Sequence, residues 1–371
     1  MTIRRRLGGA AGAMVLGIFL VGGAHAAGLE ANGYDWELLF DPATYTARGT
    51  VAYVNIEHDH SNPVVFPDGR TVVETKDQIY YNFGIKGDLG PNASCLVSAQ
   101  NPWGTEVERD LIYAALTSRA VTEKLTSTDL GLTCAYGIEM GPGVISLIGG
   151  VSAQYIKYEA DLPTPMLTTA PLEIDGWGLG WRAGLAYEIP EYALRVSAIY
   201  NAAIDYEFEG TAFGFPATAE ETTPQSVEIN AQTGIAPGWL ALANVKWTDW
   251  SVLQALDVDT VLGPISSELA YRDSWMLSAG VGHQINEQIS LVGMLTWDQG
   301  ASKPVSGDLY EASASMDRWG LSLGGLFNVN EAVQFSGGVS VSTLADGSNL
   351  GGESWDDSYI FALSGGLKGS F

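Results

Sequence analysis

The stretch YIFALSGGLKGSF, residues 359–371, alternates strictly between two kinds of residue. The odd positions carry aromatic residues, leucines and glycines, whereas the even positions after Ile360 are small or polar. Successive side chains of a β-strand point to opposite faces of the sheet, so one face of this strand is apolar and the other is not. Such a strand fits either a soluble β-sandwich or a β-barrel in a lipid bilayer. The rest of the chain distinguishes between the two.

The same period of two recurs in runs of about ten residues, as transmembrane β-strands require. It is clearest in four stretches, namely 177–187, 192–205, 226–232 and 319–328. After residue 27 no run of about 20 apolar residues occurs, which argues against a helical membrane protein. Charged residues make up 16% of the chain, whereas soluble proteins carry about a quarter. The one stretch with a helix-like pattern is 107–125.

Short turns alternate with longer polar segments along the whole chain, which is the connectivity of outer-membrane barrels. The six turns lie at 87–92, 140–143, 189–191, 236–239, 286–288 and 328–331. The seven longer segments lie at 58–70, 102–118, 161–174, 211–223, 260–271, 302–316 and 345–357. Thirteen connections join fourteen strands. The sequence therefore predicts an all-β fold, a transmembrane antiparallel β-barrel of about 14 strands over residues 44–371, with both termini in the periplasm.

A spanning sheet must close on itself, because lipid offers the backbone no hydrogen-bond partner. We therefore expect the last strand to pair with residues 44–59. Phe371 would lie at the periplasmic interface, and the closing strand would be read by the barrel-assembly machinery. Aromatic residues near strand ends fit the girdles of such barrels: Trp177, Trp239, Trp275, Trp297, Trp319 and Tyr359.

The first 26 residues have the composition of a secretory signal peptide. Three arginines precede an apolar stretch, and Ala24-His25-Ala26 forms a cleavage site. Loss of the arginines changes the formal net charge from −25 to −28. This acidic balance argues against a nucleic-acid partner and suits long outer loops, although simple solubility explains it equally well.

Cys95 and Cys134 belong to an exported chain and so to an oxidising compartment. Each lies five or six residues from a neighbouring short turn. We expect them at the same height on adjacent strands, facing outward, and bonded or nearly touching.

Five stretches, in order, resemble the outer-membrane long-chain fatty acid transporter family (FadL and the toluene/xylene channels). The most specific is APGWLALANVKWTDWSVLQAL at 236–256, and the others are 40–54, 98–110, 271–300 and 316–341. The resemblance implies a channel in the outer membrane of a Gram-negative bacterium that takes up long-chain fatty acids or other hydrophobic small molecules by passive diffusion. The resemblance also implies that outer-membrane lipid surrounds the barrel, and that the protein has no cofactor and no enzymatic activity.

The chain departs from this family in two places. Family members begin with a longer N-terminal hatch that contains an Asn-Pro-Ala motif. Here residues 27–43 form a short hatch-like segment in which Asp41-Pro42-Ala43 stands nearest to the motif, so the plug is short or absent. The third outer loop, 161–174, is also short. Its apolar residues Met166, Leu167, Leu172 and Ile174 offer either a landing patch for ligands or ordinary loop packing.

A channel for an amphiphile needs an apolar path and a basic group for the head group. The alternation turns three basic residues inward, Arg182, Arg195 and Lys246, and the first two are candidates for a carboxylate clamp. The alternative is a salt-bridge network with Asp205 and Glu228.

Two further candidates match basic positions of the family. Arg272 precedes a strand and would lie near the outer mouth, or be an exposed residue at the end of a loop. The alternation does not decide whether Lys157 points into the lumen or out of the barrel. Together with the inward residues, these are the predicted ligand-binding residues.

Catalysis and metal binding have little support. His58-Asp59-His60 lies in the first outer loop, where a His-x-His pair is weak evidence for a metal. No spacing suggests a Ser-His-Asp group. Besides a fatty acid channel, two functions remain open: a channel for monoaromatic hydrocarbons, which needs no basic site, and a structural or adhesive barrel with functional acidic outer loops.

Overall fold

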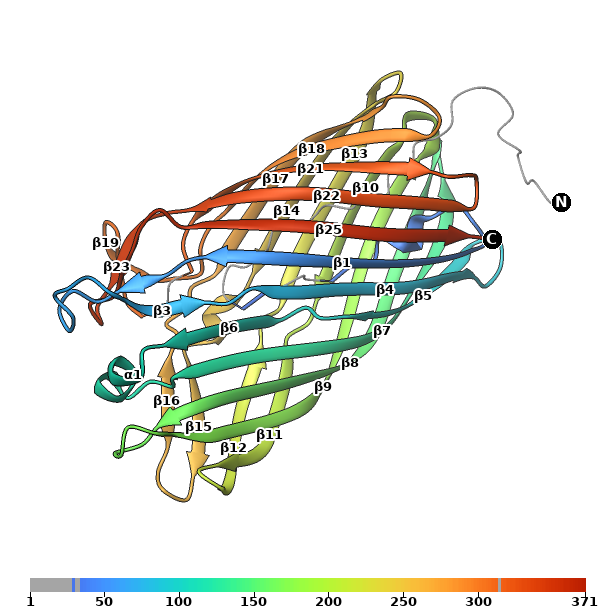
Figure 1. Ribbon diagram of the computed structural model, residues 1–371. Coiled ribbons are helices and arrows are strands. Elements are labelled where there is room, and N and C mark those ends of the chain that lie inside the picture. Colours follow the sequence, from blue (N-terminus) through green and yellow to red (C-terminus); the bar gives the residue numbers. More distant parts are fainter. Residues whose placement is uncertain (1–28, 31–33, 313–314) are drawn as a thin grey trace.

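The computed structural model describes residues 29–30, 34–312 and 315–371, and in this part of the chain fourteen antiparallel strands close into a barrel (Figure 1). The predicted signal peptide, 1–26, lies outside the described residues. The barrel strands are β1 (Tyr45–Glu57), β4 (Gln78–Asp88), β5 (Ala93–Gln100), β7 (Thr122–Met140), β8 (Gly143–Pro163), β9 (Thr169–Ile189), β10 (Leu194–Asn201), β13 (Ser226–Ala236), β14 (Trp239–Thr248), β17 (Ser274–Gln284), β18 (Ile289–Asp298), β21 (Arg318–Asn328), β22 (Val333–Leu344) and β25 (Tyr359–Ser370).

The stretch 359–371 closes the barrel. β25 pairs with β22 on one side and with β1 on the other, from Thr46 opposite Ser370 to Glu57 opposite Tyr359. The backbones of Tyr45 and Phe371 exchange two hydrogen bonds of 3.0 and 2.9 Å. The predicted pairing of the last strand with the first is therefore confirmed.

The six predicted short turns all lie at the same end of the barrel, where the strands reverse within a few residues. Between β7 and β8 only two residues separate the strands, and the first of them, Gly141, has a φ of 61°. A residue with a side chain is strained in that conformation, which explains a glycine before Pro142.

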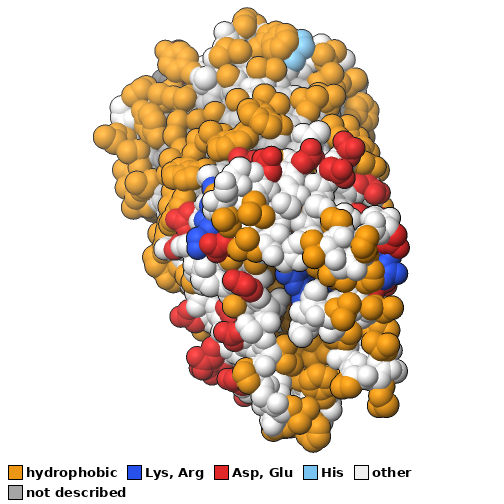
Figure 2. All heavy atoms as spheres, turned by 90° about the vertical axis from the view of Figure 1, so that its left-hand side faces the viewer, with side chains coloured by type: hydrophobic (Ala, Val, Ile, Leu, Met, Phe, Trp, Pro, Cys, Tyr) orange, Lys and Arg blue, Asp and Glu red, His pale blue; other side chains and the backbone are white. Residues whose placement is uncertain are grey.

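The two faces of the wall follow the alternation. Leu323 and Leu363 point outward and are 55% and 52% exposed, whereas their neighbours Ser322 and Ala362 are buried in the lumen. The expected girdle aromatics also lie on the outer face, with Trp177, Trp239, Trp275, Trp319 and Tyr359 exposed. Figure 2 shows hydrophobic side chains covering the wall, and acidic side chains gathered over the end that carries the long loops.

Shorter elements build the loop end. They are β2 (His60–Ser61), β3 (Thr71–Thr75), β6 (Gly104–Arg109), α1 (Leu111–Thr117), β11 (Ile204–Ala212), β12 (Phe215–Thr223), β15 (Ala255–Thr260), β16 (Ile265–Glu268), β19 (Pro304–Ser306), β20 (Leu309–Tyr310), β23 (Gly347–Asn349) and β24 (Ser354–Trp355). The 3-10 helix η3 (Trp250–Val252) also lies at this end, whereas η1 (Glu37–Phe40) lies in the lumen and η2 (Pro190–Tyr192) in the short turn between β9 and β10.

Three predicted segments are corrected here. Most of 161–174 is strand, because β8 and β9 run on beyond the bilayer and leave only residues 164–168 between them. Most of 211–223 likewise belongs to the β11–β12 hairpin. The helix-like stretch 107–125 contains one short helix, α1, whose first turn is capped by Asp110.

Among the described residues, no helix is long and apolar enough to cross a bilayer.

Cys95 and Cys134 lie directly opposite each other on β5 and β7 and form a disulfide, with their Cα atoms 4.0 Å apart. Both side chains share the outward face of their strands, Cys134 with Leu132 and Tyr136. The bond joins residues 39 apart in the sequence and staples two neighbouring strands at one height.

We expect the double variant Cys95→Ser, Cys134→Ser to fold but to lose about 2 to 4 kcal/mol of unfolding free energy, because the unfolded chain regains the entropy of a long loop. The measurement is the urea concentration at the midpoint of unfolding. The folded fraction is read from the faster-migrating band of the folded barrel in gels of unheated samples. An unchanged midpoint would show that the disulfide does not constrain the unfolded chain.

Candidate functional site

A short N-terminal segment, described at residues 29–30 and 34–41, lies inside the barrel, and its residues 34–41 fill the lumen near the short turns. The side chains of Trp36, Leu38 and Leu39 are 2% to 4% exposed. They pack against inward residues of the wall, among them Leu96 and Ile199. These apolar contacts hold the segment against the inner wall, and its role as a short plug stays a prediction.

Acidic residues of the N-terminal segment pair with basic residues of the wall. The pairs are Glu30 with Lys246 of β14, Asp35 with Arg48 of β1, Glu37 with Arg195 of β10, and Asp41 with Lys368 of β25. The Asp41–Lys368 pair spans 2.9 Å. Lys86 of β4 also donates to the backbone oxygens of Asp41 and Ala43 at 3.0 and 2.6 Å. Cations from five strands thus hold this segment across the lumen.

The predicted clamp of Arg182 and Arg195 does not form. Arg182 lies opposite Asn201 and Arg195 opposite Glu188, so six residues separate them along β10, about 20 Å. Arg182 is 3.5 Å from Asp129, and its guanidinium lies 4.9 Å from the ring centre of Tyr34.

The alternative network exists with partly different members. Glu228 faces inward and accepts hydrogen bonds from Asn244 and Asn230 at 2.8 and 3.0 Å. Asp205 instead lies on an exposed face of β11 and accepts from Thr222. The N-terminal segment supplies four of the carboxylates that the wall cations meet, Glu30, Asp35, Glu37 and Asp41.

The two remaining candidates lie apart from the lumen floor. Arg272 donates to the backbone oxygen of Gly300 at 3.2 Å and is 3.5 Å from Asp317, which ties two outer loops together. Lys157 points outward and pairs with Glu159 and Glu173 at 2.9 and 2.8 Å. A ligand contact by any of the five basic residues stays a prediction.

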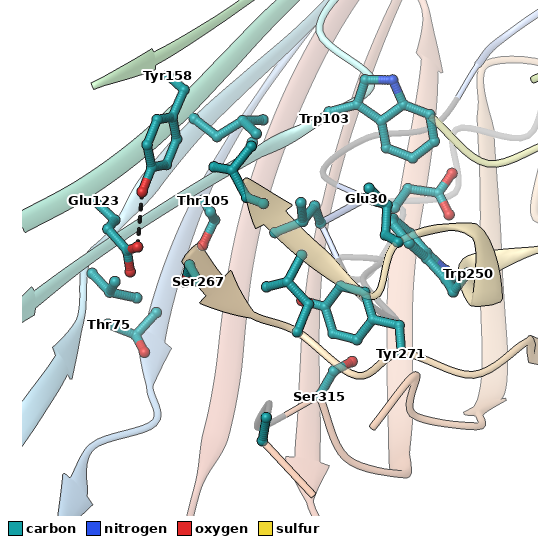
Figure 3. Close-up of a pocket in the computed structure, with 18 of the residues that line it drawn as sticks. Glu30, Thr75, Trp103, Thr105, Glu123, Tyr158, Trp250, Ser267, Tyr271 and Ser315 are labelled. Atoms are coloured by element: carbon teal, nitrogen blue, oxygen red, sulfur yellow. Dashed lines mark hydrogen bonds between the residues drawn. The ribbon is translucent and has the colours of Figure 1, made fainter. Parts of the chain in front are cut away.

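A cavity of about 320 Å³ lies inside the loop end of the barrel, above Glu30. Aromatic and aliphatic side chains dominate its lining, as apolar ligand sites require. Figure 3 shows Trp103, Trp250 and Tyr271 together on one side and Tyr158 across from them. The ring centres of Trp103 and Trp250 are 5.6 Å apart, and those of Trp250 and Tyr271 are 5.7 Å apart.

Sequence reasoning missed these aromatic residues as site residues. Trp103 and Trp250 lie within two of the stretches that carry the family resemblance, 98–110 and 236–256, and this was the available signal. Strand alternation says nothing of them, because Trp103 follows a break in the strand and Trp250 begins η3.

The charged groups of the cavity are internally compensated. Each arginine of the lining has a carboxylate partner: Arg109 with Glu123 at 2.6 Å, Arg119 with Glu353 at 2.7 Å, and Arg318 with Asp298 at 2.6 Å. Burial, with a smaller contribution from Asp257, raises the pKa of Glu221 in the outer hairpin to about 7.

The third barrel strand is broken beside the cavity. Its pairing with β7 passes from Gln100 directly to Gly104, and Pro102 in the gap has no backbone N–H to donate. The Trp103 backbone instead exchanges hydrogen bonds with the Ser127 hydroxyl, at 2.8 and 2.7 Å. The N-terminal segment reaches the wall here, since the N–H of Gly104 donates to the backbone oxygen of Leu29.

The His-x-His pair of the first loop is buried at the outer end of the cavity, with His58 and His60 both 7% exposed. Within the described ranges, no group of three or more His, Cys, Asp or Glu side chains has the arrangement of a metal site.

Comparison with known proteins agrees with this geometry. Residues 45–348 match the family described as outer membrane protein transport protein (OMPP1/FadL/TodX). The long-chain fatty acid transport protein of Escherichia coli O6:H1 is 24% identical over 287 residues, which cover 70% of this chain and 60% of that protein. The chain spans 30% to 60% of the length of the curated relatives first matched.

Two solved structures share the fold. A Pseudomonas aeruginosa FadL homologue aligns with a TM-score of 0.73 over 94% of this chain and 97% of its own, at 16% identity. The toluene transporter TodX of Pseudomonas putida aligns with a TM-score of 0.65 over 90% and 92%, at 13% identity. The match over most of the barrel shows that this chain is a Gram-negative outer-membrane protein and belongs to the OMPP1/FadL/TodX family.

Proposed function

We propose that the protein is a channel for passive uptake of hydrophobic small molecules across the outer membrane, long-chain fatty acids among them. The observation that carries this proposal is the apolar, aromatic-lined cavity inside the loop end of a closed barrel. The matched long-chain fatty acid transport protein supports the substrate class by its name. The proposed uptake needs no energy source, because transfer of the apolar molecule from water to the apolar cavity is itself favourable.

The proposed path begins at the tip of the third outer loop. Met166 and Leu167 are 83% and 54% exposed there and offer an apolar landing patch. Leu172 and Ile174 instead turn into the barrel, and Ile174 lines the cavity. A captured molecule would pass from the tip to the lining.

The proposed exit is sideways. The N-terminal segment fills the lumen below the cavity, whereas the break between β5 and β6 interrupts the wall beside it. A hydrophobic molecule that leaves at this break enters the bilayer without crossing water, which avoids the cost of solvating its apolar surface.

A second candidate is a channel for uncharged aromatic molecules. The aromatic lining favours it, as does the pairing of every lining arginine with a carboxylate. The toluene transporter among the structural matches is named for such a ligand.

Uptake into liposomes tests the proposal. Vesicles containing the protein should take up labelled oleate or toluene faster than protein-free vesicles and faster than vesicles with a porin of similar size. Selective uptake of toluene would favour the second candidate. If each ligand entered vesicles with the protein no faster than the other vesicles, the channel would be contradicted. The remaining hypothesis would then be a structural or adhesive barrel with functional acidic outer loops.

A further inference from the structure

A buried polar cluster joins three outer loops at the mouth of the cavity. Glu353, from the last loop, is 2% exposed. Its carboxylate accepts hydrogen bonds from Tyr113 and Arg119 of the second loop, both at 2.7 Å, and from Asn349 at 2.6 Å. His60, from the first loop, completes the cluster.

Glu353 is held in its ionised form. Burial alone would raise its pKa, but the neighbouring His60, Arg119 and Tyr113 outweigh burial, and its pKa lies well below the usual range. Glu353 therefore presents an ionised carboxylate to the imidazole of His60, with the Arg119 guanidinium on its other oxygen.

The two ring nitrogens of His60 differ: Nδ1 faces the Glu353 carboxylate, and Nε2 has no hydrogen-bond partner among the described residues. Its Nδ1 is 3.6 Å from a Glu353 oxygen, which is too far for a hydrogen bond, so the contact is electrostatic. No described residue gives Nε2 a hydrogen bond, although the side chain is buried and lines the cavity. The ring is held between His58 and Trp355, with ring centres 4.8 and 4.9 Å away. A buried polar atom beside an apolar cavity calls for a partner from a ligand.

We propose that His60, backed by Glu353, binds the carboxyl head group of a hydrophobic acid at the outer end of the cavity. This inference rests on the proposed uptake function and adds the residue that recognises the acid. The lining arginines suit this role less, because each already has a carboxylate partner.

The chemistry is a single proton transfer. The carboxylic acid gives its proton to Nε2, and the carboxylate that results accepts a hydrogen bond from the Nε2–H of the imidazolium. Glu353 stabilises the imidazolium from its Nδ1 side, as an opposite charge within a few ångströms does. The transfer moves one proton from the acid to the ring, so no net charge is added to the cavity. The aliphatic tail then lies along the aromatic lining.

The test compares two ligands with the same tail, oleate and methyl oleate, on detergent-solubilised protein. The variant His60→Phe keeps a ring between His58 and Trp355 but removes both nitrogens. We expect the Kd for oleate to rise about tenfold or more, as loss of a charge-assisted hydrogen bond implies, with little change for methyl oleate. The matched control His283→Phe, at the opposite end of the barrel beside Trp239, should change neither.

Infrared spectra of oleic acid labelled with ¹³C at the carboxyl group give a second readout. Labelled oleic acid bound to the wild type should show the band of the ionised carboxylate. The same ligand bound to His60→Phe should show the band of the protonated carboxylic acid. An unchanged Kd, an equal loss for both ligands, or a carboxylate band in the variant would overturn the head-group site. Failure of the wild type to bind either ligand would instead overturn the proposed function.

Discussion

Replacing Thr105 by Trp is expected to lower the uptake of oleate or toluene into liposomes by about tenfold or more, because the new side chain occupies the cavity that the ligand needs. Thr105 belongs to β6, lines the cavity and lies among Tyr158, Ser267 and Glu123 in Figure 3. The Thr105 side chain faces the cavity, so a larger side chain at this position extends into it. Overpacking costs about 1 to 3 kcal/mol, which a closed barrel tolerates.

The matched control is the next residue. Glu106 points outward, where it pairs with Lys124 at 2.7 Å. Glu106→Trp adds the same side chain to the other face of the strand and should leave uptake at the wild-type rate. Wild-type uptake by a folded Thr105→Trp variant would show that the ligand does not pass through this cavity.

The second large effect concerns the anchoring of the N-terminal segment. Lys246→Met leaves the carboxylate of Glu30 buried without its cation, and Glu228 also loses its attraction to the Lys246 ammonium. Breaking one side of a buried pair costs about 3 to 5 kcal/mol, whereas apolar replacement of both partners is close to neutral. We expect the single variant to unfold at lower urea concentration and to conduct ions across a planar bilayer, because the segment that fills the lumen is released.

The double variant Glu30→Leu, Lys246→Met should recover most of the stability and the low conductance. Lys157→Met removes a cation from the outer face and serves as the control with no expected effect on conductance. Equal loss of stability in the single and double variants would contradict the pairing, since the cost would then come from packing alone.

The fold could be predicted from the sequence because the signals for it are local. Each strand carries its own alternation of apolar and polar residues, so residues 359–371 alone show an apolar and a polar face, and the turn and loop pattern of the whole chain assigns the apolar face to lipid. Short turns also fix the height of neighbouring strands, and this allowed the positions of Cys95 and Cys134 to be inferred from their distances to two turns. The polar parts of β8 and β9 look like loops in the sequence, because a strand outside the bilayer needs no apolar face.

The candidate site was less accessible to such reasoning. Arg195 and Lys246 face the lumen as predicted, but their partners lie 158 and 216 residues away, in a segment with no strand period. Trp103 and Trp250 come from different outer loops and meet in the cavity.

The sequence by itself determined the barrel, the direction of each strand and which side chains meet lipid, since these depend on neighbours two residues apart and on nearby turns. Only the tertiary structure decided that the lumen cations hold an N-terminal segment and that His60 lies beside Glu353, 293 residues further along the chain. Closing the barrel brings distant loops together over one lumen, and no local pattern in the chain encodes which side chains then face each other.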